Sequence, residues 1–518
     1  MEKRFFFAIT LSILVLLFYS SLVPKTQPVV NKYVATNVTS AVSQVAEPVI
    51  KENSEQDFHN LLLESNLYNL KSDGLEIKFS KKGAFIYEVF DKTTSSTIAI
   101  KDIGLVKEWS QYSFNASPLS NGVIFDYKTE DGQEIKKKFI LKSNNVIELT
   151  IAISNITSSK ITSYNIFAGY NNPAEDKNAI SQRYHEASIL LNDVIVRKPT
   201  HGLKNQVDYS GKISWVGLRD RYFCVVLIPQ LTVNKGFIDI LDKGSYLALN
   251  IPERNLVNKN SLVEDQYNIY IGPQEEQSLK SFSPGAERII SYGTFDPIAK
   301  VLLFLLHALH NLTKNWGVSI ICVTILVYIV LFPLSFKSML SMKKMQALQP
   351  KIEEVRTKYK DNPQKLNVEI MELYKREKVN PFGGCLPLLL QIPVFFALYQ
   401  LLMRLISLKG AHFLWIKDLS EPDRLLYFKN ALPIMGNELN ILPLLMAFVM
   451  FGQQKFTSAT ASAASSSAAE QQKMMAIMMP VIFGVLFYKM SSGLVLYWLV
   501  NSLLMLGFQW KISKIKTT

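Results

Sequence analysis

Cysteine is scarce in this chain of 518 residues. The three cysteines, Cys224, Cys322 and Cys385, are an odd number, and two of them lie in or beside apolar runs. This argues against a disulfide framework and against a paired-cysteine metal site. The six histidines form no zinc-protease pattern, and no phosphate-binding loop, dinucleotide motif or nucleophile elbow is present. The sequence therefore gives little support to an enzyme, and we expect no metal and no cofactor.

Charge is also missing from much of the chain, and its distribution divides the sequence in two. Residues 24–296 carry 30 Lys and Arg against 31 Asp and Glu, so the net charge of +13 comes from the remaining residues. Those residues also hold nearly all the long apolar runs. A neutral domain joined to a basic, apolar half does not have the composition of a simple soluble enzyme. It also argues against direct nucleic-acid binding, which would place basic residues on the folded soluble part.

The first half predicts a membrane anchor followed by a β domain. The apolar run from Phe5 to Val23 is 19 residues long, enough to cross a bilayer core of about 30 Å, so residues 1–23 are predicted to be a transmembrane anchor. Cleavage of this run as a signal peptide is the alternative. Residues 24–56 predict a flexible linker. Short alternating runs punctuated by Gly, Asn and Asp predict a large antiparallel β-sandwich over residues 57–290.

Two local features refine this division of the chain. Residues 215–229 predict two core strands or a hairpin. Residues 296–314 predict an amphipathic helix that lies in the membrane surface, because its polar residues fall on one stripe. His307 and His310 belong to that stripe and could bind a metal, but no third ligand is evident, so the polar-face interpretation is favoured.

The second half predicts a polytopic helical bundle. Together with the anchor, five further apolar segments give six transmembrane helices, at 317–336, 385–406, 439–456, 474–490 and 493–510. The segment 439–456 is the doubtful span, because its apolar core is short and could be a buried helix. With six spans, residues 337–384, the Ala/Ser-rich loop 457–473 and the basic tail 511–518 share the side of the N-terminus. Their excess of basic residues favours a cytoplasmic location.

The segment 337–384 predicts a cytoplasmic helical hairpin. Asn362-Pro363 is expected to cap the returning helix. The hairpin is either a solvated element on the membrane or a docking site for an anionic partner or nascent chain. The apolar stripe that defines it steps by three and four residues and comprises Met345, Leu348, Ile352, Val355, Tyr359, Leu366, Ile370 and Leu373.

Uncharged polar residues within the predicted spans suggest a shallow polar cavity. Such residues are costly in hydrocarbon and usually face protein or water, although interhelical hydrogen bonding is the alternative for each of them. No Asp or Glu lies in any span, so a proton-relay transporter would lack its usual carboxylate. The residues are Thr324, Tyr328, Gln391, Gln453, Gln454, Tyr497, Asn501 and Ser502.

Four motifs closely resemble the signature of the YidC membrane insertases, part of the YidC/Oxa/Alb family. The motifs are 380–387 continuing to 395 (NPFGGCLP to QIPVF), 345–352 (MQALQPKI), 479–483 (MPVIF) and 492–498 (SGLVLYW). The anchor and large β domain resemble the Gram-negative form, with the β domain periplasmic and both termini cytoplasmic. The resemblance implies an inner-membrane insertase and chaperone that works without nucleotide hydrolysis, alone or with the Sec translocon.

The resemblance also implies partners and a substrate path. Nascent membrane proteins would be the substrates, the lipid bilayer would receive them, and the ribosome and the signal recognition particle receptor are further candidate partners. The predicted substrate groove combines the polar residues with neighbours on the third and fifth spans and on the last one. It comprises Thr324, Tyr328, Gln391, Ile392, Pro393, Val481, Tyr497, Trp498 and Asn501.

One departure from the family bears on the mechanism. The family usually places an Arg in the middle of the second span, where this chain has Tyr328. A mechanism that attracts substrate by charge is therefore in doubt here. A transporter or lipid flippase that uses the same cavity is the alternative function. An enzyme acting on envelope sugars would need a paired His and carboxylate, and the adjacent His185 and Glu186 should point to opposite faces of a strand.

Overall fold

A computed structural model describes residues 67–513, apart from short gaps. The gaps are residues 73, 143–144, 155–159, 162, 171–183, 201–202, 204, 242–243, 256–261, 361, 378, 380–385, 433–435 and 459–465. The predicted anchor 1–23, the linker 24–56 and most of the tail 511–518 lie outside the described residues.

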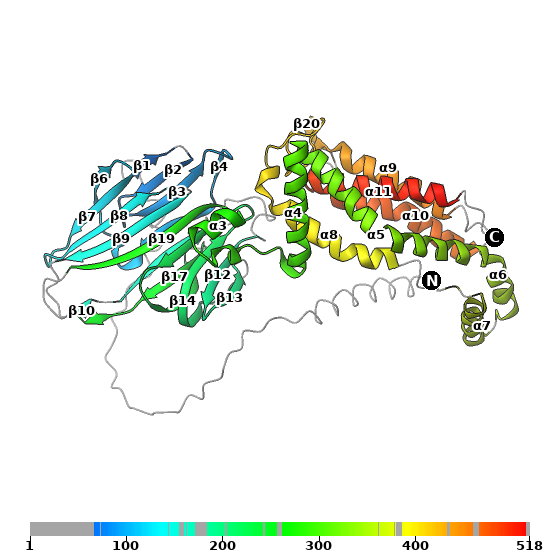
Figure 1. Ribbon diagram of the computed structural model, residues 1–518, viewed down its shortest axis with the longest axis horizontal. Helices are drawn as coiled ribbons and strands as arrows, with labels where there is room; N and C mark the ends of the chain where they lie inside the picture. Colours follow the sequence, from blue (N-terminus) through cyan, green and yellow to red (C-terminus); the bar gives the residue numbers. More distant parts are fainter. Residues whose placement is uncertain are drawn as a thin grey trace, which may run out of the picture.

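The first half of the described chain is an antiparallel β-sandwich, as predicted. Seventeen strands follow one another in a single hydrogen-bonded order, and all of their pairings are antiparallel. Figure 1 shows them as two layers at one end of the molecule. The strands are β1 Leu67–Lys71, β2 Leu75–Ser80, β3 Phe85–Asp91, β4 Ser96–Thr97, β5 Ile100–Val106, β6 Asn115–Leu119, β7 Gly122–Lys128, β8 Glu134–Leu141, β9 Val146–Ser154, β11 Tyr164–Tyr170, β12 Glu186–Leu191, β13 Val194–Pro199, β14 Val207–Arg219, β15 Phe223–Pro229, β16 Val233–Leu241, β17 Gly244–Ile251 and β19 Val263–Pro273, with a separate pair β10 Lys160–Ile161 and β18 Arg254–Asn255.

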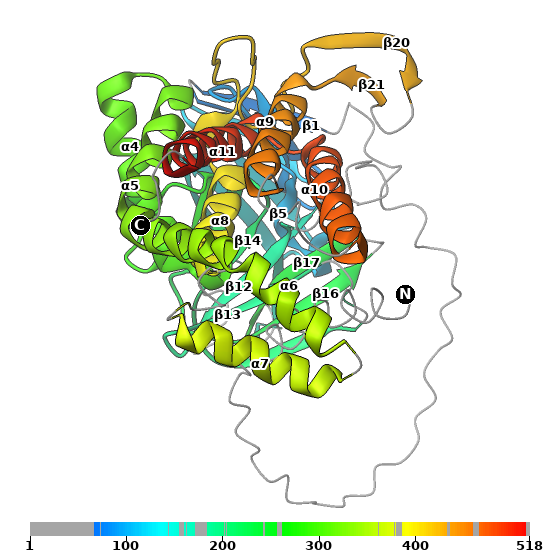
Figure 2. The ribbon, with the colours of Figure 1, turned by 90° about the vertical axis from the view of Figure 1, so that its right-hand side faces the viewer.

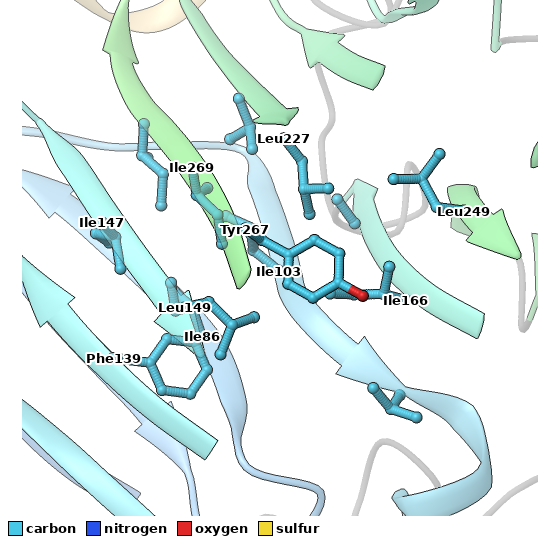
Figure 3. Packing of buried hydrophobic residues seen from close by; sticks show 14 of the residues in the cluster. Ile86, Ile103, Phe139, Ile147, Leu149, Ile166, Leu227, Leu249, Tyr267 and Ile269 are labelled. Atoms are coloured by element: carbon cyan, nitrogen blue, oxygen red, sulfur yellow. The ribbon is translucent and has the colours of Figure 1, made fainter. Parts of the chain in front are cut away.

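The core of the sandwich follows from the alternation of the strands. In β9, every second residue is buried, so Ile147, Leu149, Ile151 and Ile153 all point inward. They pack with other side chains of this core, among them the fully buried Tyr267, which lies directly across from Leu149 on the paired strand β19 (Figure 3). The domain thus contains its own hydrophobic core, which is what allows a neutral, water-facing exterior on the other face of each strand.

The segment 215–229 forms a hairpin within this sheet, as predicted. Strands β14 and β15 pair antiparallel, with Val216 opposite Leu227 and Arg219 opposite Cys224. The turn between them carries Asp220, whose carboxylate accepts the backbone N–H groups of Tyr222 and Phe223. The turn therefore has a fixed shape, and it presents Arg221 toward the helical half of the chain.

The second half is helical. After a short helix α3 Glu276–Phe282 and the 3-10 turns η3 Ala286–Ile289 and η4 Gly293–Phe295, the chain enters the bundle. Its helices are α4 Asp296–Thr313, α5 Trp316–Ala347, α6 Gln349–Lys358, α7 Pro363–Arg376, α8 Leu386–Arg404, α9 Ile441–Ser458, α10 Ser466–Phe487 and α11 Ser492–Ser513, with a small hairpin β20 Leu426–Leu432 and β21 Gly436–Leu439 between α8 and α9.

Several helices differ in length from the predicted spans. Helix α5 continues through 337–347 as one helix of 32 residues, with Pro333 inside it. Helix α10 begins at Ser466, within the predicted loop 457–473, because Ala, Glu, Gln and Lys there favour helix. Among the described residues, three helices are long and apolar enough to cross a membrane, at Gly293–Thr313, Trp316–Met345 and Ser492–Ile512, and shorter apolar helices lie at Ile441–Gln454 and Ile477–Phe487. The count of six spans stays a prediction.

Helix α4 is oriented differently from the other long helices. It runs across the bundle, at the end next to the β domain (Figures 1 and 2). Its buried side holds Ala299, Leu302 and Leu306, and Lys300 pairs with Asp296 at 2.9 Å. Such an orientation fits the predicted membrane-surface helix. The opposite end of the bundle carries α6 and α7, so the molecule has a β-domain end and a hairpin end (Figure 1).

Candidate intramembrane groove and its junction with the β domain

A polar pair joins two helices inside the bundle. The side-chain amide of Gln391 on α8 donates a hydrogen bond to the hydroxyl of Tyr497 on α11. Tyr497 is almost fully buried, whereas Gln391 is half-buried. The structure therefore brings together two of the predicted groove residues that lie 106 positions apart in the chain.

This pair sets the relative height of the two helices. From Gln391, α8 extends about 8 Å to its first residue, Leu386, and about 20 Å to Arg404 at the β-domain end. From Tyr497, α11 extends about 8 Å to Ser492 at the β-domain end, and about 24 Å to Ser513 at the hairpin end. Helix α8 is thus displaced toward the β domain, and about three turns of α11 continue past Leu386, the first residue of α8 that the structure describes after the gap at 380–385.

The remaining polar residues of the spans make hydrogen bonds to backbone carbonyls. Thr324 is buried and donates to Ile320 O of its own helix at 2.7 Å. Tyr328 donates to Leu504 O of α11 at a longer distance, 3.5 Å. Gln453 of α9 donates to Ser502 O of α11 at 2.5 Å, and Asn501 is half-buried on α11. The hydrogen bonds of Gln391, Tyr328 and Gln453 therefore all cross from another helix to α11, whereas that of Thr324 stays within α5.

Aromatic side chains surround the Gln391–Tyr497 pair. Trp498, next to Tyr497, lies 4.9 Å from Phe395 of α8 between ring centroids and stacks on Phe483 of α10 at 5.5 Å. Ile392 and Pro393 are half-buried on α8, and Val481 of α10 is exposed on the outer surface of the bundle. Sequence reasoning included Trp498 but missed Phe395, Phe483 and Phe487, which the motif 479–483 and its neighbours could have indicated.

The predicted hairpin forms a small core of its own at the other end of the bundle. Helices α6 and α7 pack through Leu348, Ile352 and Leu373, with Met345 and Ile370 at the edge. Val379 and Tyr374 also belong to this cluster and were not predicted, whereas Val355, Tyr359 and Leu366 lie outside it and are half-buried. Asn362 caps α7 as expected, since its side chain accepts the N–H of Lys365 at 3.0 Å.

An ion pair closes the open end of this hairpin. Lys351 of α6 and Glu377, just after α7, lie 2.8 Å apart. The ammonium group lowers the pKa of the Glu377 carboxyl. Because both groups are at the surface, the pair adds little stability of its own, and the apolar cluster holds the two helices together.

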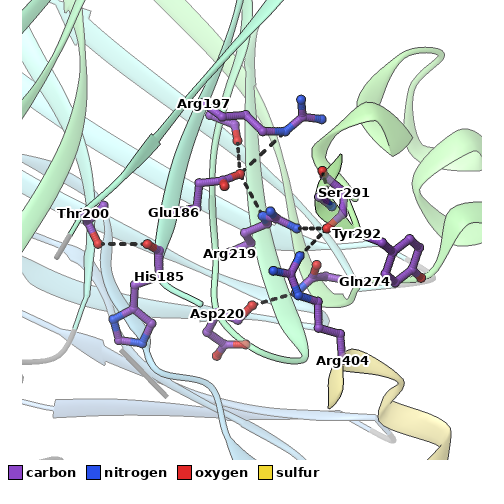
Figure 4. Close-up of polar contacts among 12 residues, drawn as sticks. His185, Glu186, Arg197, Thr200, Arg219, Asp220, Gln274, Ser291, Tyr292 and Arg404 are labelled. Atoms are coloured by element: carbon purple, nitrogen blue, oxygen red, sulfur yellow. Dashed lines mark hydrogen bonds and ion pairs between the residues drawn. The ribbon is translucent and has the colours of Figure 1, made fainter. Parts of the chain in front are cut away.

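An exchange of arginines connects the β domain to the bundle, and sequence reasoning missed it. Arg221, from the β14–β15 turn, donates to Met403 O at 2.6 Å and to Ser420 O at 3.0 Å. Met403 O is one of the carbonyls that the end of α8 leaves without a helical partner. In return, Arg404 of α8 donates to Ser291 O, on the segment that leaves the β domain (Figure 4). Each part of the molecule thus satisfies a backbone group of the other.

Glu186, the carboxylate next to His185 that was weighed for an enzyme acting on sugars, contacts arginine side chains. Glu186 accepts from Arg219 at 2.9 Å and lies 3.6 Å from Arg197, and Arg219 also donates to Ser291 O (Figure 4). Burial lowers the pKa of Arg197. The carboxylate is therefore held between two guanidinium groups that belong to the interdomain junction. Backbone atoms of His185 and Thr200 bond to one another beside it.

The histidines of α4 lie against an aromatic ring. His310 stacks on Trp316 with 3.8 Å between ring centroids, and His307 meets the same ring edge-on at 5.4 Å. Within the residues that the structure describes, no three His, Cys, Asp or Glu side chains gather as a metal site would require. The histidines thus pack around the first residue of α5.

Comparisons with known proteins agree with this division of the chain. Residues 95–305 match the family model described as the YidC periplasmic domain, and residues 308–518 match the one described as the 60Kd inner membrane protein. Several relatives are named "Membrane protein insertase YidC". That of Endomicrobium trichonymphae is 31% identical over 77% of this chain and 74% of the relative. That of Cupriavidus necator is 35% identical over 74% of this chain and 67% of the relative. That of Cupriavidus taiwanensis is 37% identical over 69% of this chain, which spans only 58% of its length.

Solved structures give weaker likenesses. A crystal structure of an active YidC insertase with its first transmembrane domain resolved covers 87% of this chain and 93% of that one, with 17% identity and a TM-score of 0.39. YidC from Thermotoga maritima gives 13% identity and a TM-score of 0.32 over 85% and 99%. A galactose mutarotase-like protein from Lactobacillus casei covers 40% of this chain and 99% of that one, with a TM-score of 0.31 and 8% identity.

The fold and the apolar helices define a polytopic helical membrane protein with a large antiparallel β-sandwich domain. Its two matched regions and its curated relatives identify the family: the chain belongs to the YidC family of membrane protein insertases.

Proposed function

We propose that this protein inserts hydrophobic segments of nascent membrane proteins into the inner membrane and assists their folding. In this proposal it works without nucleotide hydrolysis, alone or beside the Sec translocon. The β domain faces the periplasm, and the hairpin end faces the cytoplasm, where the ribosome and the signal recognition particle receptor would deliver substrates. Support comes from the family of the chain and from the names of its relatives.

The displacement of α8 relative to α11 is the observation that carries the mechanism. The described part of α8 begins about 8 Å beyond Gln391, so the inner turns of α11, with the Leu504 carbonyl that Tyr328 contacts, extend past it, and Asn501 lies about 6 Å beyond Tyr497. This favours a groove that opens at the hairpin end and closes at the Gln391–Tyr497 pair. A substrate's hydrophilic end would enter from the cytoplasm and meet uncharged polar groups partway across.

The driving force would be the transfer of the substrate's own apolar segment. About 20 apolar residues suffice to span the hydrocarbon core, and their burial in lipid is strongly favourable. The exposed surface of α10, which includes Val481, and the aromatic cluster around Trp498 would form the apolar path on which that segment leaves. Tyr328, where the family usually has Arg, contributes a hydroxyl without a charge. Substrates with acidic and neutral translocated ends should therefore insert with similar efficiency.

Reconstitution of the purified full chain into vesicles tests this function. A short phage-coat-like protein should become protected from external protease in vesicles that contain the chain and stay accessible in empty ones. A matched pair of variants separates the groove from general stability. Gln391→Leu removes the polar group at the closed end and should reduce insertion, whereas Gln454→Leu, at the inner end of α9, should have a smaller effect. Vesicles that transport small solutes or lipids, but leave the coat protein accessible, would instead support a transporter or flippase.

A further inference from the structure

A tight turn between α8 and β20 displays two apolar residues at its tip. The backbone groups of Phe413 and Ile416 exchange hydrogen bonds, at 2.9 and 2.8 Å, so that Leu414 and Trp415 are the two residues of a hairpin turn. Leu414 is 75% exposed and Trp415 is 37% exposed. The most prominent residue of the turn is therefore a leucine.

The backbone conformation of this turn is unfavourable for the residue that occupies it. Leu414 has φ of +52°, in the left-handed region, which favours Gly, Asn or Asp and is unfavourable for a branched apolar side chain. Two-residue hairpin turns usually contain Asn-Gly or Asp-Gly for this reason. A leucine that is both strained and exposed gains nothing from water, so its position points to a contact outside the protein's own core.

The turn is nevertheless firmly attached to the bundle. The ring of Phe413 lies directly on Gly317, where a Cβ atom would come within 2.1 Å of Phe413 Cγ, and Ile416 is buried. The indole N–H of Trp415 donates to Asp423, 3.2 Å away. The same Asp423 oxygen accepts the N–H groups of Ile441 and Leu442, which begin α9. The tip is thus held in register with the first turns of α5 and α9.

A second apolar element lies at the same end of the bundle. Strand β20 begins with Leu426 and Tyr427, which are 54% and 67% exposed, and Leu425 before them is also exposed. The loop that follows α8 and the β20–β21 hairpin both extend sideways from the β-domain end of the bundle, at the same level as α4 (Figures 1 and 2). They lie where the spanning helices begin, and the first turns of α5 and α9 also expose apolar residues, Val318 and Leu444.

We infer that the Leu414–Trp415 tip and the Leu425–Tyr427 strand insert into the interfacial layer of the lipid bilayer at the β-domain end. The turn is attached to the first turns of α5 and α9, which themselves expose apolar side chains, and this favours lipid over a protein as the occupant. The composition agrees, because aromatic and aliphatic side chains here are accompanied by the exposed Lys417 and Lys429, a combination suited to the headgroup region. Together with α4, these elements fix the depth at which the bundle sits. The inference does not depend on the insertase function.

Spin labels on single cysteines in the full-length chain test this directly. Cys224→Ala, Cys322→Ala and Cys385→Ser give a background without native thiols, to which Leu414→Cys and Leu426→Cys are added one at a time. Glu130→Cys, in the β7–β8 turn, is the water-exposed control, and Phe448→Cys, on the exposed side of α9, is the lipid-exposed control. Collision with oxygen, which concentrates in lipid, is compared with collision with a water-soluble nickel chelate in proteoliposomes.

The labels at 414 and 426 should collide more with oxygen than with the chelate, as the label at 448 does, and the label at 130 should show the reverse. Labels at 414 and 426 that behave like the label at 130 would overturn the inference. The inference would also be overturned if the labels at 414 and 426 were shielded from the nickel chelate only at a high protein-to-lipid ratio. The occupant would then be a second copy of the chain.

A substitution that relieves the strained turn gives an independent measurement. Leu414→Asn suits the left-handed conformation and removes the apolar side chain. The melting temperature should be unchanged or higher in detergent, and lower than that of the parent chain in lipid vesicles. An equal change in both media would mean that the turn acts only through its own backbone strain, which contradicts the lipid contact.

Discussion

In the β domain, the buried ammonium of Lys137 donates hydrogen bonds to three backbone carbonyls, whereas in the bundle the buried Tyr497 and the half-buried Gln391 share one hydrogen bond. The carbonyls belong to Gly83, Ala84 and Gly104, each about 3.0 Å from the nitrogen. Asp265 is likewise surrounded, by Arg254 and Tyr164. The sandwich excludes water by its own packing, so each buried polar group needs a full set of partners.

The bundle accommodates its polar and apolar side chains differently. Its surface exposes large apolar side chains on α5, α9 and α10, and the polar side chains of the groove, Gln391, Tyr328 and Gln453, each make a single contact to another helix. In lipid, the exposed apolar groups are in their preferred solvent, and isolated cross-helix hydrogen bonds are worth little. The two regions of one chain therefore use opposite strategies, and the predictions below test that contrast, from the largest expected effect to the smallest.

Breaking the hairpin core should have the largest effect. Leu373→Asp places an unpaired charge in the only apolar cluster that joins α6 and α7 among the described residues, at a cost of about 3 kcal/mol or more. We expect coat-protein insertion in the vesicle assay to be lost. Val368→Asp, on the exposed side of the same helix, is the control and should retain it. If both variants insert normally, the hairpin is not required.

Removing the buried cation should destabilise the β domain selectively. Lys137→Met leaves three carbonyls without their donor, which should lower the free energy of unfolding by about 1–3 kcal/mol. Hydrogen exchange of the amides in β8 and β9 measures this in the full chain. Lys136→Met, on the exposed face of the same strand, should change the stability by about 0.5 kcal/mol or less. Faster exchange throughout the bundle as well would show that the two regions do not behave independently.

The same lysine should make the β domain sensitive to pH. Burial lowers the pKa of Lys137 to about 7, from 10.5 in the unfolded chain. Between these values the unfolded state binds more protons, so the free energy of unfolding should rise with pH, by up to about 1.4 kcal/mol per pH unit. This contribution is complete above about pH 10.5 and is lost as the pH falls through about 7. Lys137→Met should remove the slope, and an unchanged slope in that variant would assign it to other groups.

Cutting the interdomain junction should affect both regions. Arg221→Ala removes the hydrogen bonds to Met403 O and Ser420 O, which should lower the stability by about 1.5–3 kcal/mol, as for hydrogen bonds to charged groups. Arg221→Lys should lie between that variant and the parent, because lysine cannot reach both carbonyls as a planar fork. Thermal unfolding in detergent is the measurement, with Lys212→Ala on the exposed part of β14 as the control. Equal melting of Arg221→Ala and the parent would show that the two parts fold separately.

The polar pair of the groove should contribute modestly to stability. A double-mutant cycle of Gln391→Leu and Tyr497→Phe should give a coupling of about 0.6 kcal/mol, the average for hydrogen bonds between membrane helices, and no more than about 1.7 kcal/mol, their maximum. The cycle needs reversible unfolding in mixed micelles. A coupling near zero would mean that water replaces the missing partner, which would favour a hydrated groove over a dry contact.

The smallest effect is expected at Tyr328. Its hydroxyl lies 3.5 Å from Leu504 O, beyond the usual range for a strong hydrogen bond. Tyr328→Phe should therefore change the stability by about 0.5 kcal/mol or less and leave most of the insertion activity. A severe loss of insertion with normal stability would give the hydroxyl a direct role toward the substrate.

The burial of Lys137 could be predicted only in part from the sequence pattern of its strand. In β8, Ile135, Lys137 and Phe139 alternate onto one face, and the apolar members of that face predict burial for all three. A lysine is almost never fully buried, so the three consecutive lysines of this strand would be assigned to the surface. Its place in the core depends on three residues with positive φ whose carbonyls accept its hydrogen bonds, Gly83 and Ala84 in the β2–β3 turn and Gly104 in β5. Nothing in β8 itself indicates them.

Local rules of the sequence determined the elements of this protein. Alternating residues specify the sandwich, Asn362 and Pro363 specify the start of α7, and long apolar runs specify the bundle, because each depends on neighbours within a few positions. The sequence motifs were sufficient to predict that the chain belongs to the YidC family. Only the tertiary structure decided the displacement of α8 against α11, the exchange of Arg221 and Arg404, and the level of the Leu414 turn. These join groups that lie about 100 to 180 residues apart in the chain, or depend on which end of a helix a loop reaches, and no local preference carries that information.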